Sequence, residues 1–186
     1  MNTLHSGGAS GADAVFGTHA KLAGHEVKHY SFLNHKHDPS CPPESIVILN
    51  DWQLSEGEPF LKEASKVLGR KYPTQSNHTN NLLRRNYHQI RNVQSVYVIG
   101  YLDDDGVVTG GTGWAVTMAA QTFVRDIYLY DQGKRQWYKF DSQTPKKLFW
   151  SLMMDLPPYP RGEYAGIGSR NMTLHGHDEI INLYRI

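Results

Sequence analysis

The sequence predicts an α/β domain with a mainly parallel sheet and helices on both of its faces, arranged in three layers. Three observations lead to this prediction. Short apolar stretches alternate with helical patterns along most of the chain, as they do in α/β folds. The stretch Val96–Gly100 is apolar without alternation, which is typical of a strand covered on both faces. Three glycine-rich turns each follow an apolar stretch and precede a helical one: Ser6–Asp13, Gly110–Gly113 and Gly166–Arg170.

The first unit of the chain reads as a strand, a turn, a helix and a second strand. Thr3–His5 predicts the first strand, and apolar residues at helical spacing from Ala12 to Ala23 predict a helix that Gly24 ends. Glu26–Phe32 then predicts an alternating strand. Such a unit is a βαβ motif with a right-handed crossover.

The remaining elements follow the same alternation. The patterns predict a loop at Leu33–Pro43, a strand at Ile46–Leu49, a helix from Leu54 or Glu58 to Gly69 and a helix at Asn80–Ile90. After the strand Val96–Gly100 they predict a helix at Trp114–Thr122, a strand at Ile127–Tyr130 and an antiparallel edge strand at Lys134–Phe140. Residues 141–163 are rich in proline and predict a surface connection with a short helix around Leu148–Met154. Residues 164–186 predict a C-terminal βα unit, with a strand at Tyr164–Gly166 and a helix at Asp178–Tyr184, and we expect one domain over residues 1–186.

Composition places the chain among globular proteins. Apolar residues make up 39% and charged residues 20%, and the formal net charge is +1. This charge provides no general attraction to duplex DNA or to an anionic membrane. The single cysteine, Cys41, excludes an intrachain disulfide and a thiolate-rich zinc site, and no membrane span or signal segment is visible, so we expect a cytoplasmic protein.

The three glycine turns indicate a phosphate-binding pocket. A glycine turn between a strand and a helix lets backbone N–H groups approach an anion at the helix N-terminus. In a parallel sheet all three turns lie at one edge, so we expect Gly8, Gly111 and Gly168 to surround one cavity. The candidate ligand-binding residues are Ser6, Gly7, Gly8, Arg85, Gly110, Gly111, Thr112, Gly113, Gly168, Ser169 and Arg170.

Several alternatives stay open for the charged candidates. Arg170 directly follows a glycine turn and can donate two hydrogen bonds to a phosphate, or form a surface ion pair. Arg85 either points into the pocket or, with Arg84, belongs to a solvated helix face. Asp13 is favourable in a first helical turn because of the helix dipole alone, and it is also the candidate for a ribose-binding or acid–base role. For His35 and His37 we favour a surface loop over a metal site, and we expect no metal and no cofactor other than a bound nucleotide.

The motifs resemble those of a known superfamily. SGGASGADAVFG, at residues 6–17, resembles the SGGAxGAD turn of the Rossmann-like proteins that include DNA-processing protein A and the LONELY GUY phosphoribohydrolases, the SLOG superfamily. The chain is most similar to small phage and bacterial members. These also carry a YxGIGSR strand, matched by residues 164–170, an Arg-Asn pair, matched by Arg85-Asn86, and a GGTG turn, matched by residues 110–113. The resemblance implies a Rossmann-like fold and a nucleotide or phosphate pocket.

The order of these motifs differs from that of the relatives. In them the GIGSR strand comes first, whereas here it comes last. The chain is then either a circular permutant, in which residues 164–186 complete their own sheet, or a protein that swaps this unit with a second copy. For the permutant we expect Tyr164–Gly166 to lie parallel to Thr3–His5, with the first and third turns side by side.

The catalytic glutamate of the phosphoribohydrolases has no counterpart after the second turn. Residues 114–125 contain no acidic residue, although cleavage of an N-glycosidic bond needs a carboxylate. We therefore expect binding of a nucleotide or another phosphorylated small molecule. The alternatives are a nucleotide N-glycosidase or phosphoribohydrolase that uses Asp13, and a single-strand DNA-binding protein, against which the near-neutral charge argues.

Overall fold

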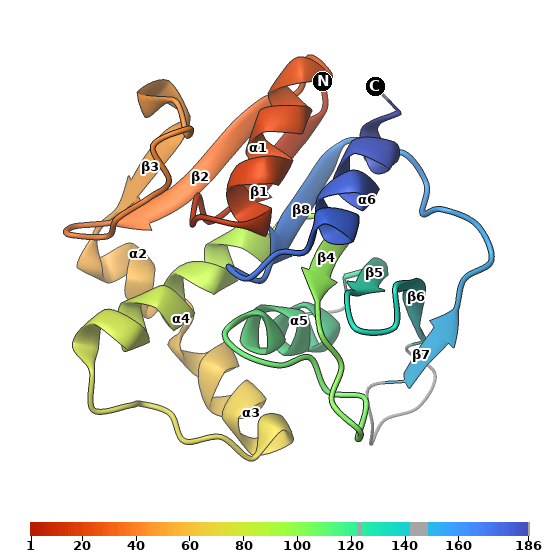
Figure 1. Ribbon diagram of the computed structural model, residues 1–186. Helices are drawn as coiled ribbons and strands as arrows, with labels where there is room; N and C mark the ends of the chain where they lie inside the picture. Colours follow the sequence, from red (N-terminus) through yellow and green to blue (C-terminus); the bar gives the residue numbers. More distant parts are fainter. Residues whose placement is uncertain (123, 142–148, 186) are drawn as a thin grey trace.

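The computed structural model describes residues 1–122, 124–141 and 149–185. Among these residues eight strands form one sheet in the order β3-β2-β1-β8-β4-β5-β6-β7 (Figure 1). The neighbours from β3 to β5 are parallel, and β6 and β7 continue the sheet in the antiparallel direction. The strands are β1 (Thr3–Ser6), β2 (Glu26–Phe32), β3 (Ile46–Leu49), β4 (Ser95–Gly100), β5 (Asp126–Asp131), β6 (Gln136–Asp141), β7 (Phe149–Leu152) and β8 (Glu163–Gly168).

The helices lie between strands along the chain, except for the last one, which follows β8. They are α1 (Ala12–Leu22), α2 (Asp51–Ser55), α3 (Glu58–Leu68), α4 (Asn77–Ile90), α5 (Thr112–Gln121) and α6 (Leu174–Tyr184), with a short 3₁₀ turn at Pro43–Ser45. Within the described ranges, no helix has the length and apolar character that crossing a membrane requires. The mainly parallel sheet and its helices confirm the predicted α/β class.

Strand β4 packs against a separate hydrophobic cluster on each face of the sheet. Val96 and Val98 belong to a cluster with residues of α3, α4 and α5. Tyr97 and Ile99 belong to a second cluster with residues of α1 and α6. All six residues of β4 are buried, because successive side chains of a strand point to opposite faces and both faces are covered. The sequence prediction of a strand covered on both faces is confirmed.

The C-terminal unit lies in the middle of the sheet. Strand β8 pairs in parallel with β1, with Leu4 opposite Tyr164, and on its other side with β4. Helix α6 packs against α1, and the N-terminus and the end of α6 lie at the same end of the molecule (Figure 1). The expected pairing of residues 164–166 with Thr3–His5 is present in this chain.

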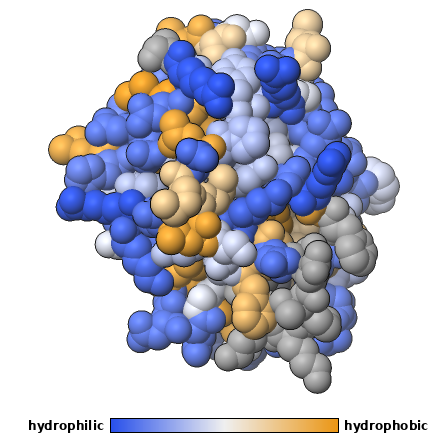
Figure 2. Space-filling model, turned by 90° about the vertical axis from the view of Figure 1, so that its right-hand side faces the viewer, coloured by the Kyte–Doolittle hydropathy of each residue, from blue (hydrophilic) through white to orange (hydrophobic). Residues whose placement is uncertain are grey.

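Strand β7 corrects two predictions from the sequence. Residues 149–152 form a strand rather than the helix predicted around Leu148–Met154; Leu148 itself lies outside the described residues. The strand forms because β6 offers an open edge, on which Trp150 pairs with Phe140, with ring centroids 5.6 Å apart. Strand β6 is consequently not an edge strand. The side of the molecule that carries β7 shows hydrophobic groups scattered over a mainly hydrophilic surface (Figure 2).

Candidate functional site

A cavity of about 390 Å³ opens at the carboxyl ends of β1, β8 and β4. Residues of helix α4 line the cavity. Helix α4 itself lies against β1, β2 and β8 (Figure 1). In doubly wound sheets ligands bind at this edge. Eight of the residues proposed from the sequence line the cavity: Asp13, Arg85, Gly110, Gly111, Thr112, Gly168, Ser169 and Arg170. Ser6, Gly7, Gly8 and Gly113 are not among its lining residues.

The three turns converge, with one difference from the expectation. Gly111 and Gly168 line the cavity, but the first turn contributes Ala9 instead of Gly8. The first and third turns are in direct contact, because the N–H of Ala12 donates to the carbonyl of Ser169 at 3.1 Å. A Cβ at Gly11 would lie 2.6 Å from that same carbonyl oxygen. The N-terminus of α1 is therefore capped by the third turn.

The donors of the first turn are used inside the protein. The carboxylate of Asp13 accepts the N–H of Gly168 at 3.2 Å, and the backbone N–H groups of Ala9 and Gly7 favour its charged form. Asp13 is only 5% exposed. Burial raises the pKa of this carboxyl, against the opposing effects of Arg85 and of the three N–H groups. Asp13 thus occupies the place where a phosphate was expected.

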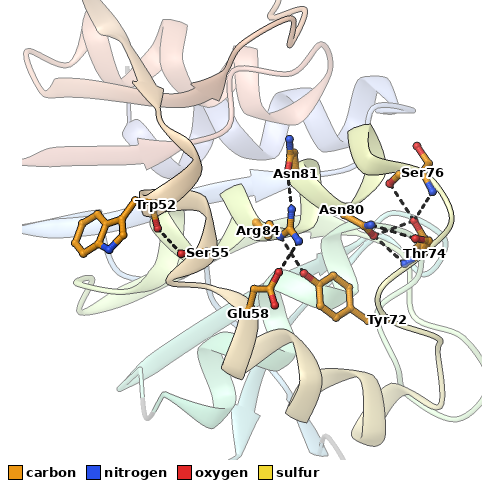
Figure 3. Close-up of polar contacts among 9 residues, drawn as sticks. All are labelled: Trp52, Ser55, Glu58, Tyr72, Thr74, Ser76, Asn80, Asn81 and Arg84. Carbon is orange, nitrogen blue, oxygen red and sulfur yellow. Dashed lines mark hydrogen bonds and ion pairs between the residues drawn. The ribbon is translucent and has the colours of Figure 1, made fainter.

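Arg85 and Arg84 have different surroundings although they are adjacent in α4. Arg84 donates to Glu58, to the Tyr72 hydroxyl at 3.1 Å and to Asn81 Oδ1 at 2.9 Å, which ties α4 to α3 and the loop between them (Figure 3). Arg85 is buried instead and lines the cavity. Of the two, Arg85 is the arginine directed to the site.

The guanidinium of Arg85 is buried, and its hydrogen-bond donors are only partly satisfied by the described residues. Its Nη1 donates to the Gly7 carbonyl, and its Nε has no hydrogen-bond partner among the described residues. Burial lowers the pKa of the guanidinium; Asp13 opposes this shift, and the nearby positive charge of Arg170 adds to it. An anion in the cavity would offset both the burial and the repulsion between the two arginines.

The second turn is open on its cavity side. A Cβ built at Gly110 or at Gly111 would meet no atom of the described residues within 4 Å. Gly111 is the N-cap of α5, and no side chain caps this helix start. The first N–H groups of a helix have no partner within it. The N–H of Trp114 donates to the Gly111 carbonyl at 3.2 Å, whereas those of Thr112 and Gly113 have no hydrogen-bond acceptor among the described residues. Arg70, which was not identified from the sequence, stabilises the turn by donating to the Gly110 carbonyl at 3.0 Å.

The third turn presents Arg170 at the mouth of the cavity. The Ser169 N–H donates to Ile99 in β4 at 2.8 Å, which fixes the turn at the end of the sheet. The Arg170 side chain is exposed and has no hydrogen-bond or ion-pair partner within residues 1–122, 124–141 and 149–185. Gln132 supports the same loop by donating to the Asn171 carbonyl at 3.2 Å. Arg170 is therefore held near the cavity with its guanidinium unoccupied.

The other candidate residues have internal contacts. Ser6 is fully buried, and its hydroxyl donates to the Gly166 carbonyl at 2.6 Å, which joins β1 to β8. Gly8 has a φ of +62° and packs against His29. Gly113 is required by packing, because a Cβ there would collide with the Val108 carbonyl. These three positions shape the site from outside the cavity.

Two buried amides of α4 complete the cavity. Asn86 donates to the Gly111 carbonyl at 3.3 Å, and its Oδ1 accepts from Gln89 at 3.2 Å. Gln89 was not identified from the sequence. Its spacing of three from Asn86 and four from Arg85 places it on the same helix face, and that spacing is the signal that could have identified it.

No cluster of three metal-ligating side chains occurs in the described part of the chain. His35, considered above, instead contacts Ser31 Oγ through Nδ1 at 2.9 Å. Comparison of the chain with family models, with curated proteins and with solved structures found no match. The interpretation of the cavity therefore depends on its own geometry.

Proposed function

We propose that the cavity binds a phosphorylated small molecule, with a nucleotide as the leading class. The observation that carries the proposal is the open second turn, which faces the same cavity as Arg85 and Arg170. Free N–H groups at a helix start and two guanidinium groups are the arrangement that proteins use for phosphate.

In this proposal the phosphoryl group lies at the start of α5. Its oxygens accept backbone N–H groups there, and the helix dipole favours its negative charge. Arg170 donates to it from the mouth of the cavity, and Arg85 provides a positive charge from the buried side. A charge-assisted hydrogen bond of this kind contributes about 1.5–3 kcal/mol.

The rest of the ligand extends along α4. Leu82 and Leu83 provide apolar surface there, and Asn86 provides a polar group. Tyr101, the residue that follows β4, also lines the cavity. With about 390 Å³ the cavity is at the small end of the range for ligand sites, roughly 300–1,000 Å³, so it accommodates one small molecule.

We also propose that the chain is a three-layer, Rossmann-like member of the SLOG superfamily with a circularly permuted order. Two observations support this proposal. Strand β8, which carries the GIGSR motif, pairs with β1, which leads into the SGGAxGAD motif. The two motifs are also joined by the hydrogen bond from Ala12 to Ser169. A chain in which a linker joins residue 186 to residue 1, with new ends opened before Tyr164, should then fold and retain the cavity.

A ligand panel tests the proposed function. The thermal unfolding midpoint of the purified protein is measured with nucleoside monophosphates, sugar phosphates and inorganic phosphate, and the same samples are analysed for free base. We expect a rise in the midpoint with at least one phosphorylated compound and none with the corresponding nucleoside. Release of free base would make the cavity a catalytic site.

Arg170→Ala provides the matched variant. Loss of about 1.5–3 kcal/mol of binding free energy corresponds to roughly a ten- to hundredfold weaker affinity for the compound found in the panel. Arg161→Ala is the control, since Arg161 is also exposed and does not line this cavity. Equal affinities of the two variants would contradict a phosphate position between the second and third turns.

A further inference from the structure

The carboxylate of Asp13 lies inside an anion-binding arrangement that the protein has built. The N–H of Gly168 donates to it at 3.2 Å, and the backbone N–H groups of Gly7 and Ala9 also favour its charged form. The guanidinium of Arg85 approaches the same place, since a Cβ at Gly7 would collide with that guanidinium and lie 2.6 Å from Asp13 Oδ2. Converging backbone N–H groups beside a cation form an anion site whether the anion is a ligand or a side chain.

This arrangement adjoins the cavity. Asp13, Arg85 and Gly168 all line it, together with the open second turn. Arg85 is nine-tenths buried and retains an unpartnered Nε. The two anion positions, one filled by Asp13 and one open at the start of α5, therefore share a single cavity.

We propose that Asp13 determines the specificity of the cavity, because its carboxylate fills the second anion position and thereby restricts the ligand to a single phosphoryl group. The restriction on the ligand rests on the function proposed above, whereas the occupied anion position does not. A second phosphoryl group placed next to the first would meet a buried carboxylate without water between them. Such repulsion is an efficient way to exclude a ligand of higher charge.

The proposal predicts what happens when the carboxylate is removed. Asp13→Ala removes the acceptor of the Gly168 N–H and the negative charge that favours the charged form of Arg85, and it leaves space that is continuous with the cavity. The variant is therefore destabilised, and an added anion that fills the vacated position restores its stability. Asp13→Asn is the matched control, since the amide removes the charge but still occupies the space.

The experiment compares the wild-type protein, Asp13→Ala and Asp13→Asn in inorganic phosphate and in pyrophosphate. At pyrophosphate concentrations about 100 times the dissociation constant, we expect the unfolding midpoint of Asp13→Ala to rise by about 5 °C or more. The ratio of pyrophosphate to phosphate affinity should be at least tenfold higher in Asp13→Ala than in the wild-type protein. Asp13→Asn should show no rescue, because the amide still fills the position, and an affinity ratio between those of the wild-type protein and Asp13→Ala, because the charge repulsion is gone. Asp38→Ala, which removes a more exposed carboxylate of a nearby loop, should show neither effect.

The possible outcomes separate this proposal from the proposed function. Pyrophosphate rescue of Asp13→Ala alongside a wild-type protein that binds none of the phosphorylated compounds in the ligand panel would support the Asp13 assignment and overturn the proposed function. A folded Asp13→Ala with an unchanged affinity ratio and no rescue would overturn the Asp13 assignment alone. If Asp13→Ala and the polar variant Asp13→Ser both stay unfolded at every pyrophosphate concentration, the assignment is also overturned, because rescue is its central expectation.

Discussion

The first and second glycine turns have similar sequences but opposite surroundings. At Gly7 of the first turn, the space that a Cβ would need is filled by Arg85 and Asp13. At Gly110 and Gly111 of the second turn, none of the residues that the structure describes fills the corresponding space. Glycine in the first turn allows protein groups to approach each other, and glycine in the second leaves room for a ligand. A glycine-rich turn thus indicates a close approach of something to the backbone without indicating what approaches.

The largest expected effect is that of removing β8, which lies between β1 and β4, the strands that precede the first and second turns. Removing residues 163–186 deletes β8 from between β1 and β4, and with it the Ser169 carbonyl that caps α1. The loss exceeds the roughly 5–15 kcal/mol that stabilises a domain of this kind, so we expect an insoluble or unfolded product. Solubility and circular dichroism check this. A folded, soluble product that retains phosphate binding would contradict the role given to β8.

Alanine substitutions at Gly7 and Gly111 test the comparison directly. Gly7→Ala forces apart the Asp13 and Arg85 side chains, and we expect it to cost about 3 kcal/mol or more, measured by urea unfolding. Gly111 has a φ of −66°, and the described residues leave room for a Cβ there. Gly111→Ala should therefore change the free energy of unfolding by less than about 1 kcal/mol, while the new methyl group weakens phosphate binding. A stable Gly7→Ala with weakened phosphate binding, together with a destabilised Gly111→Ala, would contradict the ligand position at the second turn.

Low pH should decrease the free energy of unfolding through two buried histidines near the first turn, His29 and His35. Burial, with further repulsion from Arg85, lowers the pKa of His29 and of His35 to about 4. Because these pKa values lie below the ordinary value of 6.5, the stability that the neutral rings contribute is present above pH 6.5 and is lost as the pH falls toward 4. The raised pKa of Asp13 acts in the opposite direction and offsets part of this loss.

The size of the acid effect follows from the shift. At about 1.36 kcal/mol per pKa unit, His29 alone accounts for up to roughly 3 kcal/mol of unfolding free energy between pH 7 and pH 4. Urea unfolding over this range should show a shallower pH dependence for His29→Gln than for the wild-type protein. The exposed His175→Gln is the control. Equal slopes for the two variants would show that His29 does not titrate as described.

The smallest expected effect distinguishes the two adjacent arginines. Arg84→Ala loses contacts with Glu58, Tyr72 and Asn81 that are partly exposed, so we expect a loss of about 1 kcal/mol in unfolding free energy. Phosphate affinity should stay unchanged, since Arg84 does not line the cavity. A large loss of affinity in a titration would mean that α3 and its loop contribute to the site.

Local patterns in the sequence were sufficient for most of the elements. Strands β2 and β3 have the predicted bounds, and β4 differs by one residue, because apolar runs and glycine stops report burial and chain reversal directly. Strand β7 was missed because its residues form a strand only by pairing with β6, a contact between separate segments. The same limit applies at the site. The position of Asp13 in its helix was evident, but the N–H of Gly168, which donates to its carboxylate, approaches Asp13 only in the folded sheet.

The place of β8 in the sheet has a consequence for how the chain folds. Strand β8 is synthesised after the seven other strands of the described sheet, yet it lies between β1 and β4. Until it arrives, β1 and β4 each present an unpaired, apolar edge, which is the condition under which chains associate wrongly. Contacts between Leu4 and Tyr164 span most of the sequence, and contacts of such separation slow folding. The sheet therefore closes only after translation of residues 163–168, and folding on the ribosome should stop at two separate half-sheets.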